Sequence, residues 1–234
     1  MKISISDHDA RVFPSTREEA QALQERLNAG IVLRPAYPGW GAAVRFAAGL
    51  AAAFPSPGVC RCAAVVWDVL EERVVDRAVA EAPASFPYVP GLQAFRELPA
   101  ALEALRRIGT RAEAVLCAAH GIAHPRRFGM ASHIGLAVGL PSVGCAERLI
   151  TGEVSTISGE QLQMRGAGAP VLAGGEQVGV ALYTRGGTKP LYVSPGHLAD
   201  IESAAELVLR CTGKYRRPEP LRRARIAVKF EASP

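Results

Sequence analysis

The sequence predicts an α/β domain with a mixed sheet, in which an antiparallel edge leads into a parallel strand–helix–strand unit. Residues 44–82 hold three strand-like apolar runs separated by the turn segments PSPG and EE, the pattern of a hairpin or meander. Further along, a short apolar run at 112–119, a helical pattern at 129–140 and a strand-like run at 141–146 follow one another. This order of elements is typical of helices that cover a central mixed sheet.

Two further helices frame this unit. Ser15 followed by Glu18 indicates a capping box for a helix that Gly30 can end. The segment 92–109 has apolar residues at helical spacing, although Pro99 is expected to interrupt or restart that helix.

The carboxyl-terminal third continues the same pattern. Strand-like segments at 175–185 and 189–196 precede a helix at 200–213 whose apolar positions can cover the sheet. The chain shows neither an internal repeat nor a linker that would divide it, so we expect a single domain over residues 1–234.

Composition limits the cellular context. The chain of 234 residues is 49% hydrophobic, which is ample for a core, yet it has no run of eighteen apolar residues. The N-terminal segment MKISISDHDARVF lacks the apolar centre of a signal peptide. We therefore expect a cytoplasmic protein without a membrane partner, and a monomer.

Cysteine usage and charge narrow the function further. The five cysteines have no paired CxxC spacing, so we expect buried, reduced thiols rather than disulfides or structural zinc. Net charge is +5, and residues 210–229 carry eight cations against the single Glu219. A basic edge of this kind suits a polyanion such as nucleic acid, although a solvated basic tail would have the same composition.

The segment CAAHGIAHPRRFGMASH at 117–133 has the composition of a site. It holds three of the five histidines and no carboxylate. It follows the predicted strand at 112–119, and ligands bind at the carboxyl ends of strands in open α/β sheets. His133 lies inside the predicted helix and is expected to be structural.

Two long motifs carry a family resemblance. FPYVPGLQAFRE at 86–97 and HGIAHPRRFGMASHIGLAVGLPSVG at 120–144 resemble the endonuclease V family, and VSPGH at 193–197 with GKYRRPEP at 213–220 agrees with its C-terminal end. The resemblance covers nearly the whole chain. It implies a ribonuclease H-like fold and an enzyme of DNA repair that uses magnesium to cut a phosphodiester 3′ to deaminated adenine (inosine).

The resemblance implies a lesion-binding half of the site. Residues 87–90 match the family's wedge, which enters the duplex while the lesion is extruded; they are Pro87, Tyr88, Val89 and Pro90. Gly91 and Gly121 are expected where backbone approaches the flipped base, because glycine has no Cβ. His124 and Arg126 match the glycine loop, where they are expected to shape the pocket or hold a phosphate.

The resemblance also implies a metal-binding half, and here the sequence departs from the family. Glu97 matches a metal ligand of the two-metal type, and His197 matches a histidine close to the same metals. The positions of the family's two aspartates hold Ala51 and Ala118, and its lysine position holds Glu147. Because Mg²⁺ prefers carboxylate, phosphate and water oxygens, we expect weak or lost metal binding, and Glu147 is expected to repel a phosphate.

Two hypotheses therefore stay open. In one, the chain is an endonuclease V that acts on inosine in DNA or RNA; His120, Asp68 or Asp76 would then compensate for the missing ligands, although imidazole suits softer metals than magnesium. In the other, the chain binds inosine-containing or distorted nucleic acid without cutting it.

Overall fold

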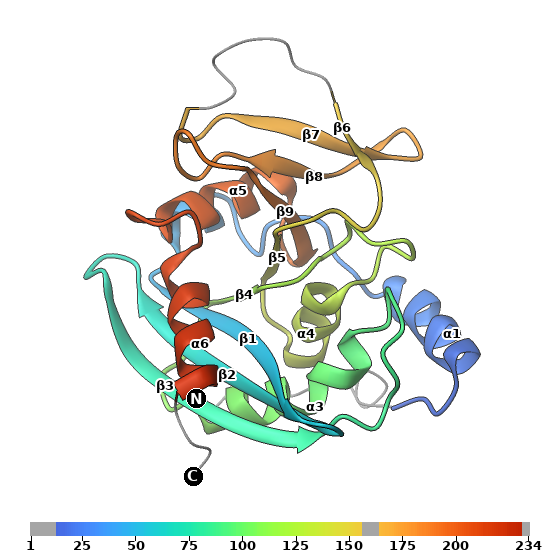
Figure 1. Ribbon diagram of the computed structural model, residues 1–234. Helices are drawn as coiled ribbons and strands as arrows, with labels where there is room; N and C mark the ends of the chain where they lie inside the picture. Colours follow the sequence, from blue (N-terminus) through green and yellow to red (C-terminus); the bar gives the residue numbers. More distant parts are fainter. Residues whose placement is uncertain (1–12, 156–163, 231–234) are drawn as a thin grey trace.

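The computed structural model describes residues 13–155 and 164–230, and its strands form one mixed sheet. The sheet order is β3-β2-β1-β4-β5-β9-β8-β7-β6 (Figure 1). The strands are β1 (Phe46–Ser56), β2 (Val59–Asp68), β3 (Arg73–Pro83), β4 (Ala114–Cys117), β5 (Ser142–Ala146), β6 (Glu153–Val154), β7 (Gly168–Ala173), β8 (Glu176–Leu182) and β9 (Leu191–His197). The helices are α1 (Arg17–Asn28), α2 (Trp40–Ala43), α3 (Ala94–Arg107), α4 (Met130–Val138), α5 (Ile201–Arg210) and α6 (Glu219–Phe230).

The pairing confirms the predicted mixed sheet. β1, β2 and β3 form an antiparallel meander, whereas β1, β4 and β5 run parallel, with α4 connecting β4 to β5. β9 runs antiparallel to β5 and starts the second antiparallel edge. The carboxyl ends of β1, β4 and β5 therefore meet at one edge of the sheet.

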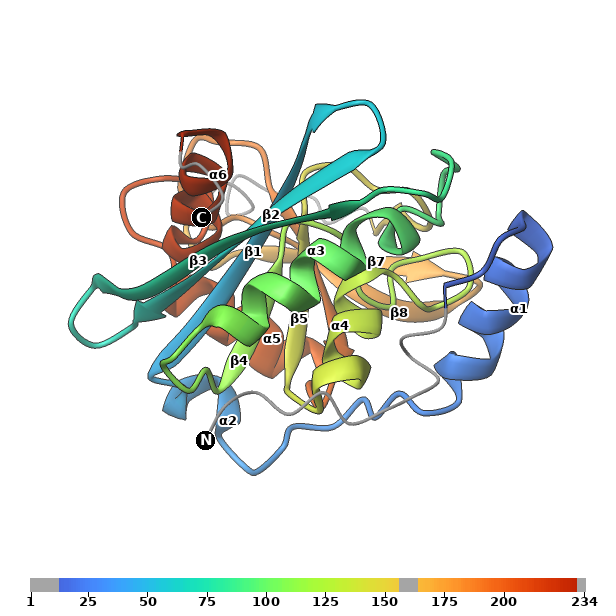
Figure 2. The same cartoon turned by 90° about the horizontal axis from the view of Figure 1, so that it is seen from below.

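Helices cover both faces of this sheet. Helices α3 and α4 contact each other and cover one face, where alternate β1 residues such as Ala48 and Leu50 join the core (Figure 2). Helices α5 and α6 pack on the other face, which receives Ala47 and Ala51 from the same strand. Alternation along β1 therefore directs Ala51 toward α6.

The crossing of α6 over β1 depends on one close approach. A Cβ at Gly49 would lie only 2.3 Å from the carbonyl carbon of Pro220, so the start of α6 rests directly on the strand. This contact brings one face of α6 to the edge where β1, β4 and β5 end. The sequence indicated only a basic edge here, because cations lie between the apolar residues of α6.

Several local expectations are corrected. The capping box of α1 uses Thr16 and Glu19, one residue later than predicted, because the Thr16 side chain accepts the N–H of Glu19. Pro99 lies inside an uninterrupted α3, whose buried apolar face stabilises the helix despite the missing hydrogen bond. Strands β6 and β7 were not predicted.

All five cysteines are unpaired and buried, as expected. Within the described ranges, no helix is long and apolar enough to cross a membrane.

Candidate nucleic-acid interface

A cleft of about 510 Å³ lies at the carboxyl ends of the parallel strands. β1, the loops after β4 and β5, the first turn of α3 and one face of α6 line it. The residues that line it include Ala51, Glu97, Ala118, His120, Glu147, Arg148, Arg217, Arg225 and Lys229. The glycine–histidine loop at 117–121 therefore borders a cavity, at the strand end where the sequence placed it.

The structure brings Ala51 and Ala118 together. In the parallel register Leu50 pairs with Cys117, so the next residues of both strands are neighbours at the mouth of the cleft. Ala51 faces α6 within an apolar cluster that includes Val65 and Val228, and Ala118 is exposed. Two methyl groups thus occupy the positions at which the resemblance implies carboxylates.

Glu97 is the acid that α3 presents to this cleft. Its carboxylate is buried and accepts a hydrogen bond from the Gln93 side chain, and burial raises its pKa. The thiols of Cys62 and Cys117 line the same wall. Among the described residues, no group of three His, Cys, Asp or Glu side chains is arranged to hold a metal ion. A single carboxylate with a raised pKa does not fit Mg²⁺, which needs several hard oxygen ligands.

The placement expected for His197 is corrected. His197 ends β9 beside Ser142, the first residue of β5, and so lies at the opposite end of the strands from the cleft. Its Nδ1 accepts the N–H of Val32 at 3.3 Å, and burial lowers its pKa. The antiparallel direction of β9 causes this difference, because the end of β9 meets the start of β5.

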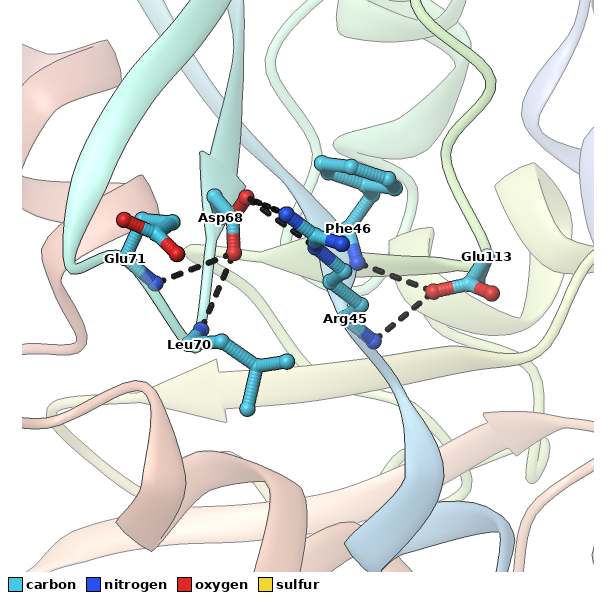
Figure 3. Close-up of polar contacts among 6 residues, drawn as sticks. All are labelled: Arg45, Phe46, Asp68, Leu70, Glu71 and Glu113. Carbon is cyan, nitrogen blue, oxygen red and sulfur yellow. Dashed lines mark hydrogen bonds and ion pairs between the residues drawn. The ribbon is translucent and has the colours of Figure 1, made fainter.

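The two acids considered as replacement ligands also lie elsewhere. Asp68 is buried at the amino end of β1, where it pairs with Arg45 at 3.0 Å and accepts the N–H groups of Leu70 and Glu71 (Figure 3). The Arg45 hydrogen bond holds the pKa of Asp68 below its usual range.

Asp76 and Glu113 cap backbone at other sites. Asp76 accepts the N–H groups of Gly109 and Thr110 after α3. Glu113 accepts the N–H groups that begin β1, at 2.7 and 2.9 Å (Figure 3). All three acids therefore have structural partners away from the cleft.

His120 does line the cleft, but its ring is already engaged. Its Nε2 lies 2.8 Å from the Arg148 carbonyl, and burial lowers its pKa. The neutral ring ties the loop after β4 to the loop after β5. His133, expected to be structural, is buried in the core with ring centroids of Phe95 and Phe128 at 5.4 and 5.2 Å.

The charges around the cleft are mainly positive. Glu147, expected to repel a phosphate, pairs with Arg217, which offsets its charge. Arg148, Arg225 and Lys229 line the cleft without a carboxylate partner among the described residues. Positive potential thus surrounds the space between Ala51 and Ala118.

The predicted wedge projects from the molecule beside this cleft. Tyr88 is 66% exposed, an unusual position for a large aromatic side chain. The Arg96 guanidinium carbon lies 5.9 Å from the Tyr88 ring centroid and 4.4 Å from that of Phe54, which is also exposed. Phe54, from the β1–β2 hairpin, was not predicted as a site residue, because it lies outside the motifs at 86–97 and 120–144.

The carbonyl of Gly91 anchors the wedge. It accepts hydrogen bonds from His124 Nε2 at 2.8 Å, Gln24 Nε2 at 3.0 Å and Arg126 Nη2 at 3.1 Å. Gly91 has a φ of +78°, a left-handed conformation that favours glycine. We call these four residues the Gly91 clamp. It joins α1 and the glycine loop to the wedge.

The clamp defines what His124 and Arg126 do. His124 Nε2 and Arg126 Nη2 donate to the Gly91 carbonyl, and Arg126 Nε donates to the Gln24 side chain at 2.6 Å. These contacts favour the expected role of shaping the pocket loop. Burial lowers the pKa of His124 to about 4, and its Nδ1 accepts the N–H of Arg126. Gln24 was missed, although a glutamine beside Leu23 and Leu27 on the buried face of α1 was a usable signal.

Gly121 has a packing role against β9. A Cβ at this position would lie 2.0 Å from the carbonyl oxygen of Pro195, and the Gly121 N–H donates to Ser194 Oγ at 2.8 Å. The backbone of β9 by itself therefore requires glycine here, and the approach of a base to this position stays a prediction.

Comparisons with known proteins agree on one family. The family model for endonuclease V matches residues 25–226. An endonuclease V from Nocardia farcinica is 42% identical over 213 residues, which cover 91% of each chain. The crystal structure of endonuclease V from Streptomyces avermitilis superposes with a TM-score of 0.85 at 39% identity, covering 98% of this chain and 96% of that one.

A more distant structure shares the fold. Endonuclease V from Ciona intestinalis, crystallised in complex with a 24mer DNA containing an inosine followed by a ribo-adenosine, has a TM-score of 0.76 at 23% identity; 92% of this chain and 96% of that chain are covered. The predicted ribonuclease H-like fold is thus confirmed. The chain belongs to the endonuclease V family.

Proposed function

We propose that this protein binds inosine-containing nucleic acid and does not cut it by the metal-dependent route of its family. The observation that carries this proposal is the isolation of Glu97, which faces two alanines and several cations where a metal site needs further carboxylates. Magnesium chemistry in this cleft would require ligands that the described residues do not supply.

Family membership and the wedge support recognition of a lesion. The Ciona intestinalis protein, which shares this fold, was crystallised with inosine-containing DNA. In the present chain the clamp holds an exposed Tyr88 in a defined loop, so little conformational entropy is lost when the ring contacts nucleic acid. An aromatic side chain can replace part of the stacking that is lost when a base leaves the helix.

Each part of the interface has a role in this proposal. Tyr88 and Pro90 enter the nucleic acid beside the extruded base. Arg96 stacks against the rings of Tyr88 and Phe54, and its charge faces the phosphate backbone of the nucleic acid. The cations of α6 and of the loop after β5 attract the phosphates. We further propose that the chain acts as a monomeric, single-domain, cytoplasmic protein, with RNA as a second candidate ligand beside DNA.

One experiment tests recognition and cutting together. Matched oligonucleotides with inosine or adenine at one position, as DNA and as RNA, are titrated by fluorescence anisotropy with EDTA or Mg²⁺, and the same samples are run on denaturing gels. We expect preferential binding of the inosine strand in either condition and no cut product. Equal affinity for inosine and adenine would contradict recognition, and magnesium-dependent cutting would show an ordinary family enzyme.

A further inference from the structure

We infer that the cleft binds a phosphate of the nucleic-acid backbone directly through Arg225 and Lys229 of α6, without a bridging metal ion. This inference deepens the proposed function and rests on it for the identity of the ligand. Three features of the cleft carry it: the arrangement of cations on α6, their lack of carboxylate partners among the described residues, and the small number of carboxylates on the wall that faces them.

The first feature is the face of α6 that these two side chains share. Arg225 and Lys229 are four residues apart, so they lie one turn from each other on the same side of the helix. Leu221, one turn before Arg225, and Val228, next to Lys229, also line the cleft. Both cations therefore project at the cavity that Ala51 and Ala118 border.

The second feature is a contrast within the same helix. Arg222 and Arg223 both bind the carboxylate of Glu219, at 2.8 and 3.2 Å. Arg225 and Lys229 are exposed, and no ion pair joins them to another described residue. Like charges at this spacing destabilise a helix slightly, and an anion held between them would remove that repulsion.

The third feature is the opposite wall. The Glu97 carboxylate is buried on the α3 side, where it accepts a hydrogen bond from the Gln93 side chain, and the charge of Glu147 is matched by Arg217. Arg148 adds a further cation at the rim. An anion that enters this cleft therefore meets three cations, Arg148, Arg225 and Lys229, whereas Glu97 is the one carboxylate of the described lining that no ion pair neutralises.

The chemistry of the side chains selects a phosphate oxygen. A guanidinium presents several N–H donors in a fixed plane, and an ammonium acts as a compact charge, so the pair can bind two oxygens of one phosphodiester. The bond to phosphorus stays intact, because the cleft offers charge without an activated nucleophile.

The test compares the variant R225S/K229S with a control, R34S/K189S, that removes the same charge from exposed residues outside the cleft. Affinity for an inosine-containing duplex and for its adenine counterpart is measured in EDTA at several salt concentrations. We expect the dependence of log K on log salt to fall by about 2 in R225S/K229S, and affinity at 0.1 M salt to fall roughly tenfold to a hundredfold. The control should stay close to wild type.

The outcomes separate this inference from the proposed function. A salt dependence in R225S/K229S equal to that of the control, or wild-type binding that requires Mg²⁺ and is lost in EDTA, would overturn it. If R225S/K229S shows the expected weaker salt dependence, but the wild-type protein binds the inosine and adenine duplexes equally, only lesion recognition is overturned. If no duplex binds, inorganic pyrophosphate is titrated in EDTA, and failure to bind wild type more tightly than R225S/K229S overturns the inference.

Discussion

The Gly91 clamp and the cleft belong to the same site, but they differ in whether their polar groups have partners within the protein. In the clamp, one carbonyl accepts three donors, and His124 uses both ring nitrogens. In the cleft, Arg225 and Lys229 have no carboxylate partner among the described residues. Polar groups that satisfy one another stabilise a loop, whereas charges without partners are available to a ligand. The clamp therefore stabilises the wedge loop, and the cations of the cleft are available to bind the nucleic acid.

Adding carboxylates to the cleft should have the largest effect, because it would give the cleft metal binding and cutting that it lacks. The variant A51D/A118D/R225S adds two carboxylates to the cleft that Glu97 lines and removes one cleft-lining cation of α6, while Glu147 keeps its partner Arg217. We expect measurable Mn²⁺ binding by calorimetry and a rise in cutting of inosine DNA of about 100-fold or more over wild type. The neutral control A51N/A118N/R225S should show neither. A folded acid variant that binds no Mn²⁺ would show that more than these groups is missing.

Acid pH should weaken the clamp next most strongly. Burial lowers the pKa of His124 from 6.5 to about 4, so the unfolded chain takes up a proton before the folded one does. The stabilisation is complete above pH 6.5 and is lost as pH falls toward 4, by on the order of 3 kcal/mol. Urea unfolding at several pH values measures it.

H124Q provides the comparison for this pH effect. It should remove most of the slope between pH 6.5 and 4, while His120 and His197, whose pKa values burial also lowers, retain a smaller one of the same sign. An unchanged slope in H124Q would contradict the neutral, buried state of this histidine.

Adding a methyl group at Gly91 should loosen the clamp by an intermediate amount. Its φ of +78° disfavours alanine, and the new Cβ would lie 3.2 Å from Arg126 and 3.3 Å from His124. We expect G91A to cost about 1–2 kcal/mol of unfolding free energy and to reduce the preference for inosine. G58A has a similar φ of +76° with open space around it, and so isolates the backbone cost. Equal inosine preference in both variants would separate the clamp from recognition.

Releasing Arg217 in the cleft should give the smallest effect. E147Q removes the partner of Arg217 at a partly exposed pair, so stability should change by less than about 0.5 kcal/mol. One more cation then faces the nucleic acid, and affinity should rise about twofold to fivefold at low salt. E153Q, at an exposed acid outside the cleft, is the control for net charge. A fall in affinity would mean that the pair positions the interface.

Sequence patterns predicted the elements whose apolar periodicity is clear. The β1–β2–β3 meander and the β4–α4–β5 unit follow from alternation, helical spacing and turn residues between them. Helix α6 was missed although its buried residues Leu221, Ala224 and Val228 recur at helical spacing, because the cations between them led us to predict only a basic edge. Short edge strands such as β6 carry too few residues to show a period.

The site was predictable where position follows from strand order. Ala51, Ala118 and Glu97 were expected together, and parallel register with the first turn of α3 does bring them to one cleft. His197 was misplaced because its location depends on the direction of β9, which the motif does not encode. Arg225 and Lys229 were predicted only as part of a basic edge, because the face of α6 that meets the cleft is fixed by packing.

The central claim is that this cleft binds nucleic acid but lacks the ligands for metal-dependent cutting. The most direct measurement is a single-turnover assay in which excess protein is mixed with an inosine-containing oligonucleotide in Mg²⁺ or Mn²⁺. Bound and cut fractions are read from the same sample. We predict a bound, intact strand throughout. A bound strand that is cut efficiently, with the cutting abolished by EDTA and by E97Q, would contradict the claim.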